Sequence, residues 1–252
     1  MFDEWSVKII KYNNLFICIF FMVRKITLSL ALFCVLGAVQ AQNLQLHFDP
    51  RNSLYGDEVG SKNYLTATFE MFKPDKWGST FMFIDFDFNG GDKRWIGMVY
   101  GEISRTFTIK NFPLMPHIEY NGGLGSGFSI PSAYLAGFEY PFQLGNFFMG
   151  TYVAYKLNAF EKSSHDLQWT LTWNAMLADG KLSLGGFADV WSANKNRVTG
   201  EGGKRVIFLS EPQIWYNFTP NFSIGSEIEL SYNFARYEKF AAIPTIATKW
   251  NF

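Results

Sequence analysis

The sequence predicts an all-β protein, a closed transmembrane antiparallel β-barrel of about twelve strands. Three observations carry this prediction. Polar and apolar residues alternate with a period of two along most of residues 42–252. Aromatic residues make up 19% of the chain and gather at the ends of the alternating segments. After residue 41, no apolar run approaches the roughly 18–20 residues that a membrane-spanning helix needs.

The N-terminal region has the pattern of a secretory signal peptide. Arg24 and Lys25 precede the apolar stretch 26–37, and Val39-Gln40-Ala41 ends in the small residue that a signal peptidase requires. We therefore expect residues 22–41 to be a signal peptide that is cleaved after Ala41. The alternative is that the apolar stretch stays in place as a membrane anchor, although it is short for that role.

Residues 1–21 precede a signal that is already complete. Because Met22 restarts the chain, we expect 1–21 to be an upstream extension from a misassigned start codon, with an extra anchor at 15–21 as the alternative. The mature domain, 42–252, then loses both cysteines, Cys18 and Cys34. Such a domain cannot use disulfides, zinc thiolates or a thiol nucleophile.

The charge balance argues against a nucleic-acid partner. The chain has 22 Lys and Arg against 22 Asp and Glu, so it offers no basic footprint. Low charge and high aromatic content also argue against disorder.

Strand and connection lengths give the expected topology. We expect strands at about 42–49, 62–73, 77–89, 95–109, 113–121, 130–141, 145–157, 165–176, 180–192, 204–217, 221–233 and 240–252. Every odd-numbered connection is longer than its even-numbered neighbours in this assignment. Outer-membrane barrels have short periplasmic turns and longer extracellular loops. An even number of strands places both termini of the barrel domain in the periplasm.

Alternation alone does not distinguish a membrane barrel from a soluble lipocalin-like barrel. Residues 165–176 place Leu167, Trp169, Leu171 and Trp173 on one face, where large rings suit lipid better than a small core. Aromatics at strand ends predict two girdles: Trp77, Trp95, Phe112, Tyr140, Phe147, Phe148, Trp191, Tyr216, Phe218, Phe234 and Trp250.

The C-terminal strand adds a localisation signal. It ends in Phe252 and resembles the segment read by the barrel-assembly machinery. We therefore expect the outer membrane of a Gram-negative bacterium, with outer-membrane lipid and that machinery as partners.

If apolar residues face lipid, the alternating polar residues on the same strands face the lumen. The expected lumen or substrate-facing residues are Glu70, Phe81, Phe83, Asp85, Asp87, Glu102, Glu119, Glu211, Gln213, Trp215, Glu227 and Glu229. Acidic groups dominate this set, and so many carboxylates cannot all be charged in a dry interior without partners. We expect a hydrated, negative lumen that favours cations and neutral polar solutes. In the alternative, loop Lys or Arg side chains pair with the carboxylates and plug the barrel.

Four residues break the alternation. Phe81, Phe83 and Trp215 fall on the polar face, where they either stack flat solutes or mark a bulge that flips the parity. Arg105 falls on the lipid face, so we expect it near the periplasmic rim, or turned inward by a bulge.

The sequence offers no enzyme constellation. His47, His117 and His165 are scattered, and no Gly-x-Ser-x-Gly motif occurs. Asp85 and Asp87 share a face without a third ligand nearby in the sequence, so lumen charge explains them better than a metal site. We expect no enzymatic activity, no cofactor and no metal.

Several segments resemble a known family. Residues 64–85, with the turn Lys73-Pro74-Asp75-Lys76-Trp77, look like the opening of the nucleoside-specific channel-forming (Tsx-like) outer-membrane proteins. Glu102-Ile103-Ser104-Arg105, 134–139 and Trp250-Asn251-Phe252 are also similar, nearest to a Bacteroidetes branch labelled a domain of unknown function. The resemblance implies a narrow twelve-stranded barrel with nucleoside-binding aromatics and ionisable groups in its lumen.

Together these observations predict a passive outer-membrane channel for small polar solutes, with nucleosides as the leading candidates. The alternatives are a non-conducting structural or adhesin-like barrel that binds through its loops, and a soluble lipocalin-like binder.

Overall fold

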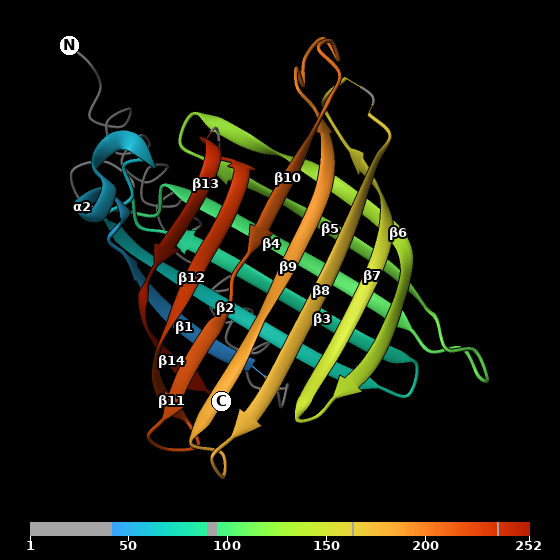
Figure 1. Ribbon diagram of the computed structural model, residues 1–252, viewed down its shortest axis with the longest axis vertical. Coiled ribbons are helices and arrows are strands. Elements are labelled where there is room, and N and C mark those ends of the chain that lie inside the picture. The colour runs from blue at the N-terminus through green and yellow to red at the C-terminus, as the bar shows by residue number, and fades with distance from the viewer. Residues whose placement is uncertain (1–41, 90–94, 163, 236) are drawn as a thin grey trace, which may run out of the picture. The chain divides into compact units, whose positions relative to one another are not determined.

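The computed structural model describes residues 42–89, 95–162, 164–235 and 237–252. The expected signal peptide, the upstream extension and both cysteines lie outside these residues. The described chain is a single antiparallel β-sheet closed into a barrel, which confirms the predicted fold class (Figure 1). No helix in the described ranges is long and apolar enough to cross a membrane.

Strands make up most of the described chain. They are β1 (Gln42–Asp49), β2 (Tyr64–Asp75), β3 (Gly78–Asp87), β4 (Met98–Phe107), β5 (Met115–Gly125), β6 (Phe128–Leu144), β7 (Phe147–Asn158), β8 (Asp166–Leu177), β9 (Leu182–Asn194), β10 (Lys204–Ser210), β11 (Gln213–Asn217), β12 (Phe222–Phe234), β13 (Tyr237–Pro244) and β14 (Ile246–Asn251). A short helix, α2 (Arg51–Tyr55), and a 3-10 turn, η1 (Gly56–Glu58), follow β1.

These fourteen segments form twelve strands around the barrel, because two of the twelve are each interrupted and so consist of two segments. β10 and β11 pair with β9 and β12 in one unshifted register across Glu211 and Pro212. β13 and β14 likewise keep one register along β12 across Thr245. Proline has no N–H to donate to a ladder, so Pro212 and Pro244 account for interruptions at these places. β1 pairs with β14 and closes the barrel.

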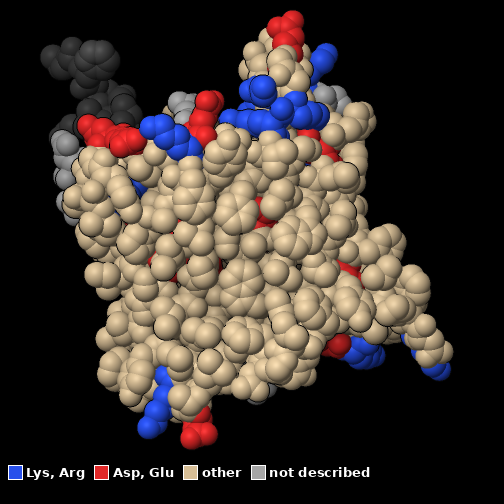
Figure 2. Space-filling model, viewed as in Figure 1, with Lys and Arg blue, Asp and Glu red and all other residues tan. Residues whose placement is uncertain are grey.

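The two faces of the sheet follow the expected alternation. On β8, Asp166, Gln168 and Thr170 are buried inside, whereas Leu167 and Trp169 are exposed outside. The outer wall in Figure 2 is almost free of charge, and charged side chains gather at its two ends. A polar inside and an apolar outside are the arrangement of a membrane barrel, opposite to that of a soluble one.

The connections differ in length between the two ends of the barrel. The end that carries residues 50–63, 88–89, 95–97, 159–162, 164–165 and 195–203 is called the loop end, and the end with residues 76–77, 145–146, 178–181 and 218–221 the turn end. Three connections depart from the expected order. β5 and β6 extend farther than expected and leave only residues 126–127 between them, whereas residues 108–114 make a longer connection at the turn end. β12 and β13 are likewise separated by only two residues.

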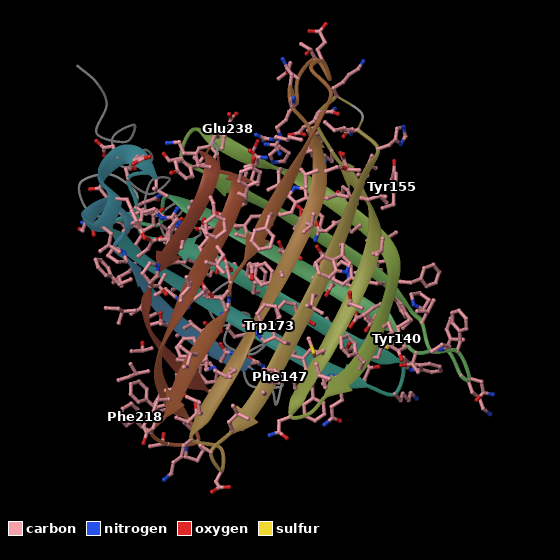
Figure 3. The ribbon with its side chains drawn as sticks, in the orientation of Figure 1. Tyr140, Phe147, Tyr155, Trp173, Phe218 and Glu238 are labelled. Atoms are coloured by element: carbon pink, nitrogen blue, oxygen red, sulfur yellow. The ribbon has the colours of Figure 1, made fainter. Side chains whose placement is uncertain are left out.

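Exposed aromatic side chains lie near both ends of the outer wall. Phe147 and Phe218 lie toward the turn end and Tyr155 toward the loop end (Figure 3). Trp191 was expected in a girdle, but this expectation is wrong. Its register partners are Gln168 and Ile207, and the Lys156 ammonium lies 4.8 Å from its ring, so it faces the lumen.

Candidate functional site

The lumen wall formed by β3 and β4 carries a strip of aromatic rings. The β2–β3 and β3–β4 registers are unshifted, so no bulge turns Phe81 and Phe83 outward. The ring centroids of Phe81 and Phe83 are 6.2 Å apart, and those of Phe83 and Tyr100 are 6.0 Å apart. Phe83 lies opposite Glu70 on β2 and Glu102 on β4. Aromatic faces and carboxylates therefore share one wall.

The carboxylates on this wall accept hydrogen bonds from neutral donors. Thr68 donates to Asp85 at 2.6 Å, and Tyr100 donates to Glu102 at 2.6 Å. Asn43 donates to Glu70 at 3.0 Å. Neutral donors orient a carboxylate without supplying a compensating positive charge.

A second acidic group lies farther round the wall. Tyr152 donates to Glu119 at 2.8 Å, and Thr170 donates to Asp189 at 2.6 Å. His117 stacks on Tyr152, with 4.1 Å between ring centroids, and lies 3.3 Å from both Glu119 and Glu139. Sequence parity predicted Glu119 as a lumen residue, but it did not predict the contacts that join Glu119, His117 and Glu139.

Trp215 faces the lumen, as predicted, but is packed into the wall. Only 1% of its surface is exposed. The His47 ring meets it edge-on at 5.9 Å, and the Lys249 ammonium lies 4.3 Å from its ring. Its indole N–H donates to Gln213, which in turn donates to Glu227 at 2.6 Å. Gln213, Trp215 and Glu227 thus form one bonded row, with little of the indole free to meet a solute.

A guanidinium from the first loop enters the loop end of the lumen. Arg51 on α2 is buried and lies 2.7 Å from both Asp49 and Glu229. Burial alone would lower the pKa of Arg51, but the hydrogen bond from Arg51 to Asp49 and the charge of Glu229 outweigh it and raise this pKa. Arg51 therefore stays charged and ties α2 to the barrel wall.

Asp87 lies at the same end and is almost completely buried. Thr66 and Tyr64 donate hydrogen bonds to it at 2.5 and 3.0 Å, and the Lys62 ammonium is 3.7 Å away.

Glu211 lies in the interruption between β10 and β11, where its backbone N–H donates to the Phe187 carbonyl at 3.1 Å.

Sequence reasoning missed several cations that reach the lumen. Lys156 lies on the lumen side of β7 and donates to Gln168 at 2.7 Å, and Lys204 lies 2.8 Å from Asp166. Parity applied to β7 could have found Lys156, because it shares a face with Tyr152. No periodic signal marks Arg51, which lies in a loop. The acidic excess is therefore smaller than the sequence indicated.

Acidic groups still outnumber cations among the described lumen residues. The carboxylates are Asp49, Glu70, Asp85, Asp87, Glu102, Glu119, Glu139, Asp166, Asp189, Glu211, Glu227 and Glu229, and the cations are Arg51, Lys62, Lys156, Lys204, Arg205 and Lys249. No cluster of three or more metal-ligating side chains occurs in the described ranges.

The fold and lumen define a porin-like membrane barrel. Residues 41–252 match the family described as "Domain of unknown function (DUF5020)", and the chain belongs to that family. No curated protein sequence matches the chain.

The chain is similar to several solved structures. The NanC porin superposes with a TM-score of 0.52 at 10% identity, covering 84% of this chain and 99% of the porin. The KdgM porin in complex with disordered oligogalacturonate gives 0.46 at 6% identity, over 84% and 99% of the two chains. LpxR from Salmonella typhimurium gives 0.45 at 9% identity, over 84% and 100%. At these identities the likeness to NanC establishes the fold alone, and the Tsx-like resemblance stays a prediction.

Proposed function

We propose that this protein is a passive channel for small polar solutes in the outer membrane, exported by its N-terminal signal peptide. The observation that carries the proposal is the lumen, which is lined by polar and charged side chains along its strands while the outside is apolar. A dry core would not hold so many carboxylates without cationic partners, whereas a hydrated pore accommodates them. Absence of enzymatic activity is part of the same prediction.

Nucleosides are the solutes that we propose for the aromatic strip. Phe81, Phe83 and Tyr100 offer ring faces on which a nucleobase can stack. Glu70 and Asp85 lie beside them and accept hydrogen bonds, as sugar hydroxyls require. Trp215 is left out of this site because its ring is already covered by His47 and Lys249.

Planar-bilayer conductance of the membrane-extracted protein tests both parts of the proposal. We expect discrete, cation-preferring steps that added nucleosides reduce. Phe83→Ala should weaken this block by about tenfold, because base–aromatic stacking contributes about 1–3 kcal/mol per base. Phe138→Ala, which removes an exposed ring from the outer wall, is the matched control and should leave the block unchanged.

Two results would count against the proposal. A folded barrel without conductance would contradict the channel and favour a non-conducting structural or surface-binding barrel. If nucleosides leave the conductance unaltered, the proposal that nucleosides are the solute would be wrong, while the proposed channel would stand. Phe83→Tyr keeps the ring face and should restore the block.

A further inference from the structure

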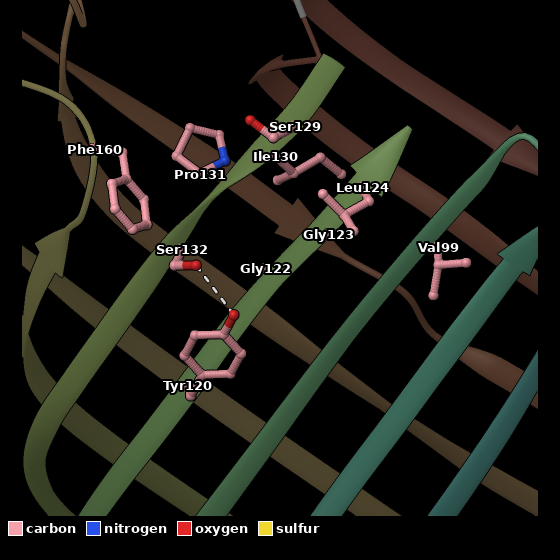
Figure 4. A pocket seen from close by; sticks show the side chains of 10 residues that line it. All are labelled: Val99, Tyr120, Gly122, Gly123, Leu124, Ser129, Ile130, Pro131, Ser132 and Phe160. Carbon is pink, nitrogen blue, oxygen red and sulfur yellow. Dashed lines mark hydrogen bonds between the residues drawn. The ribbon is translucent and has the colours of Figure 1, made fainter. Parts of the chain in front are cut away.

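A pocket of about 430 Å³ lies in the outer wall, near the loop end of β4, β5 and β6 (Figure 4). Its sides come from Val99, Leu124, Ile130 and Pro131, and Phe160 of the β7–β8 connection borders it. Phe160 is 94% exposed, so the rest of the protein covers almost none of its side chain. This pocket is separate from the lumen that the proposed channel uses.

Two glycines hollow the wall at this place. The β5–β6 ladder shifts register between Asn121 and Gly123, which marks a bulge. A Cβ on Gly122 would stand 3.1 Å from the Tyr120 hydroxyl and 3.2 Å from that of Ser132. Because glycine has no side chain, a space remains between Tyr120 and Ser132 and the strand. The hydroxyls of Tyr120 and Ser132 are hydrogen-bonded to each other at 3.0 Å.

The pocket opens on the membrane side of the wall. Tyr120 alternates with Glu119 and Asn121, which are buried inside, so it points outward, and Leu124 is 70% exposed. A cavity in this position is filled from the bilayer, because its surroundings in the membrane are lipid. An acyl chain fits its apolar sides, and the hydroxyl pair can bond an ester, amide or hydroxyl group of the same lipid.

The loops beside the pocket carry an excess of basic residues. Lys162 follows Phe160 by two positions, and its backbone N–H donates to the Arg197 carbonyl of the β9–β10 connection. That connection also carries Lys195. Arg197 pairs with Glu161, but Lys162 has no such ion pair among the described residues.

We propose that this pocket is a binding site for an anionic glycolipid of the outer leaflet, one acyl chain filling the hollow and a phosphate meeting Lys162. This inference rests on the proposed outer-membrane function, with the longer loops on the extracellular side as in outer-membrane barrels. Apolar burial binds the chain, and the ammonium selects the phosphate. Neither contact involves a lumen residue.

Native mass spectrometry of the detergent-extracted full chain tests the site. The probes are phosphorylated lipid A, the same lipid without its phosphates, and phosphatidylethanolamine. We expect phosphorylated lipid A to be retained best. Ser129→Phe places a ring into the pocket from an exposed position and should lower retention about tenfold. Ala136→Phe adds the same ring farther along β6 on the outer wall and should leave retention unchanged.

Two further variants complete the test. Phe160→Ala removes part of the border from a loop and should also weaken retention, which keeps the test available if Ser129→Phe fails to fold. Lys162→Gln should lower retention of the phosphorylated lipid only, with Lys110→Gln at the turn end as control. Equal retention by the unmodified protein, Ser129→Phe and Phe160→Ala would overturn the site, whatever the conductance shows.

Discussion

Arg105 shows how the depth of a residue in the membrane decides which side chain its position tolerates. It lies on the lipid-facing side of β4, two residues from the turn end of the strand. Its guanidinium lies 2.7 Å from Asp75, donates a second bond to that carboxylate at 2.8 Å, and bonds Thr80 at 3.0 Å. The predicted position near the rim is therefore confirmed. The Phe107 ring, 5.5 Å away, gives this cation an aromatic neighbour as well.

The position of Ile103, on the same face of β4, should not tolerate an arginine. It lies in the middle of the ten-residue strand and is 46% exposed toward lipid. We expect Ile103→Arg to lower the free energy of unfolding by about 2–4 kcal/mol, the cost of Arg at the bilayer midplane. Arg105→Leu should change it by less than about 1 kcal/mol, since rim ion pairs contribute little. Urea unfolding in lipid vesicles measures both, and equal costs would contradict this depth assignment.

Residue-level prediction from the sequence is possible only where a residue belongs to an alternating strand. Phe83, Asp85 and Glu102 were assigned to the lumen by parity alone, and the unshifted registers of β3 keep them there. Arg51 could not be assigned in this way, because a helical turn in a loop has no sheet parity. Its pairing with Glu229, 178 positions away in the chain, depends on barrel closure.

At the scale of elements, the closure seam differs from the other strand contacts. Among the described segments, β13 pairs with β12 alone, while β14 pairs with both β12 and β1. The α2–η1 segment lies beside the free edge of β13 (Figure 1). Tyr55 donates its hydroxyl to the Ala242 carbonyl at 2.6 Å, and Lys239 lies 3.2 Å from Glu58. A loop thus covers an edge that a strand would otherwise leave open.

Removing one contact at this seam should loosen β13 locally. Tyr55→Phe deletes the bond to Ala242 and keeps the ring, at a cost of about 0.5–1.5 kcal/mol. We expect faster amide hydrogen exchange over residues 237–244 and unchanged exchange in β7 and β8, because exchange reports local opening. Tyr64→Phe, which removes a bond to Asp87 away from this edge, is the control. Unchanged exchange in β13 would show that Tyr55 does not hold the seam.

The predicted order of the strands was more accurate than their predicted continuity. Residues 204–217 and 240–252 were each expected as one strand, and each keeps one register along its neighbours. Pro212 and Pro244 were visible in the sequence and account for the interruptions. The short β5–β6 turn was not predictable from a glycine-rich segment, because Gly122 and Gly123 extend β5 in place of a loop.

At the scale of the whole molecule, the lumen charge should control ion selectivity. Carboxylates outnumber cations among the described lumen residues, and Glu70 and Asp85 lie on the neighbouring strands β2 and β3 of one wall. Such a collective field attracts cations without any single binding site. Exposed fields of this kind are screened by salt over a Debye length of about 10 Å at 0.1 M and about 3 Å at 1 M.

We therefore expect the preference for K⁺ over Cl⁻ to fall toward unity as salt rises from about 0.1 to about 1 M, because the screening length then shortens from about 10 Å to about 3 Å. Reversal potentials across a salt gradient measure this ratio. Glu102→Gln removes a carboxylate that has Tyr100 as its neutral partner, so it should lower the ratio at low salt and lose its effect at high salt. Glu201→Gln, in an exposed loop, is the control. A ratio independent of salt would assign selectivity to a local constriction, and a preference for anions would contradict the acidic lumen as its source.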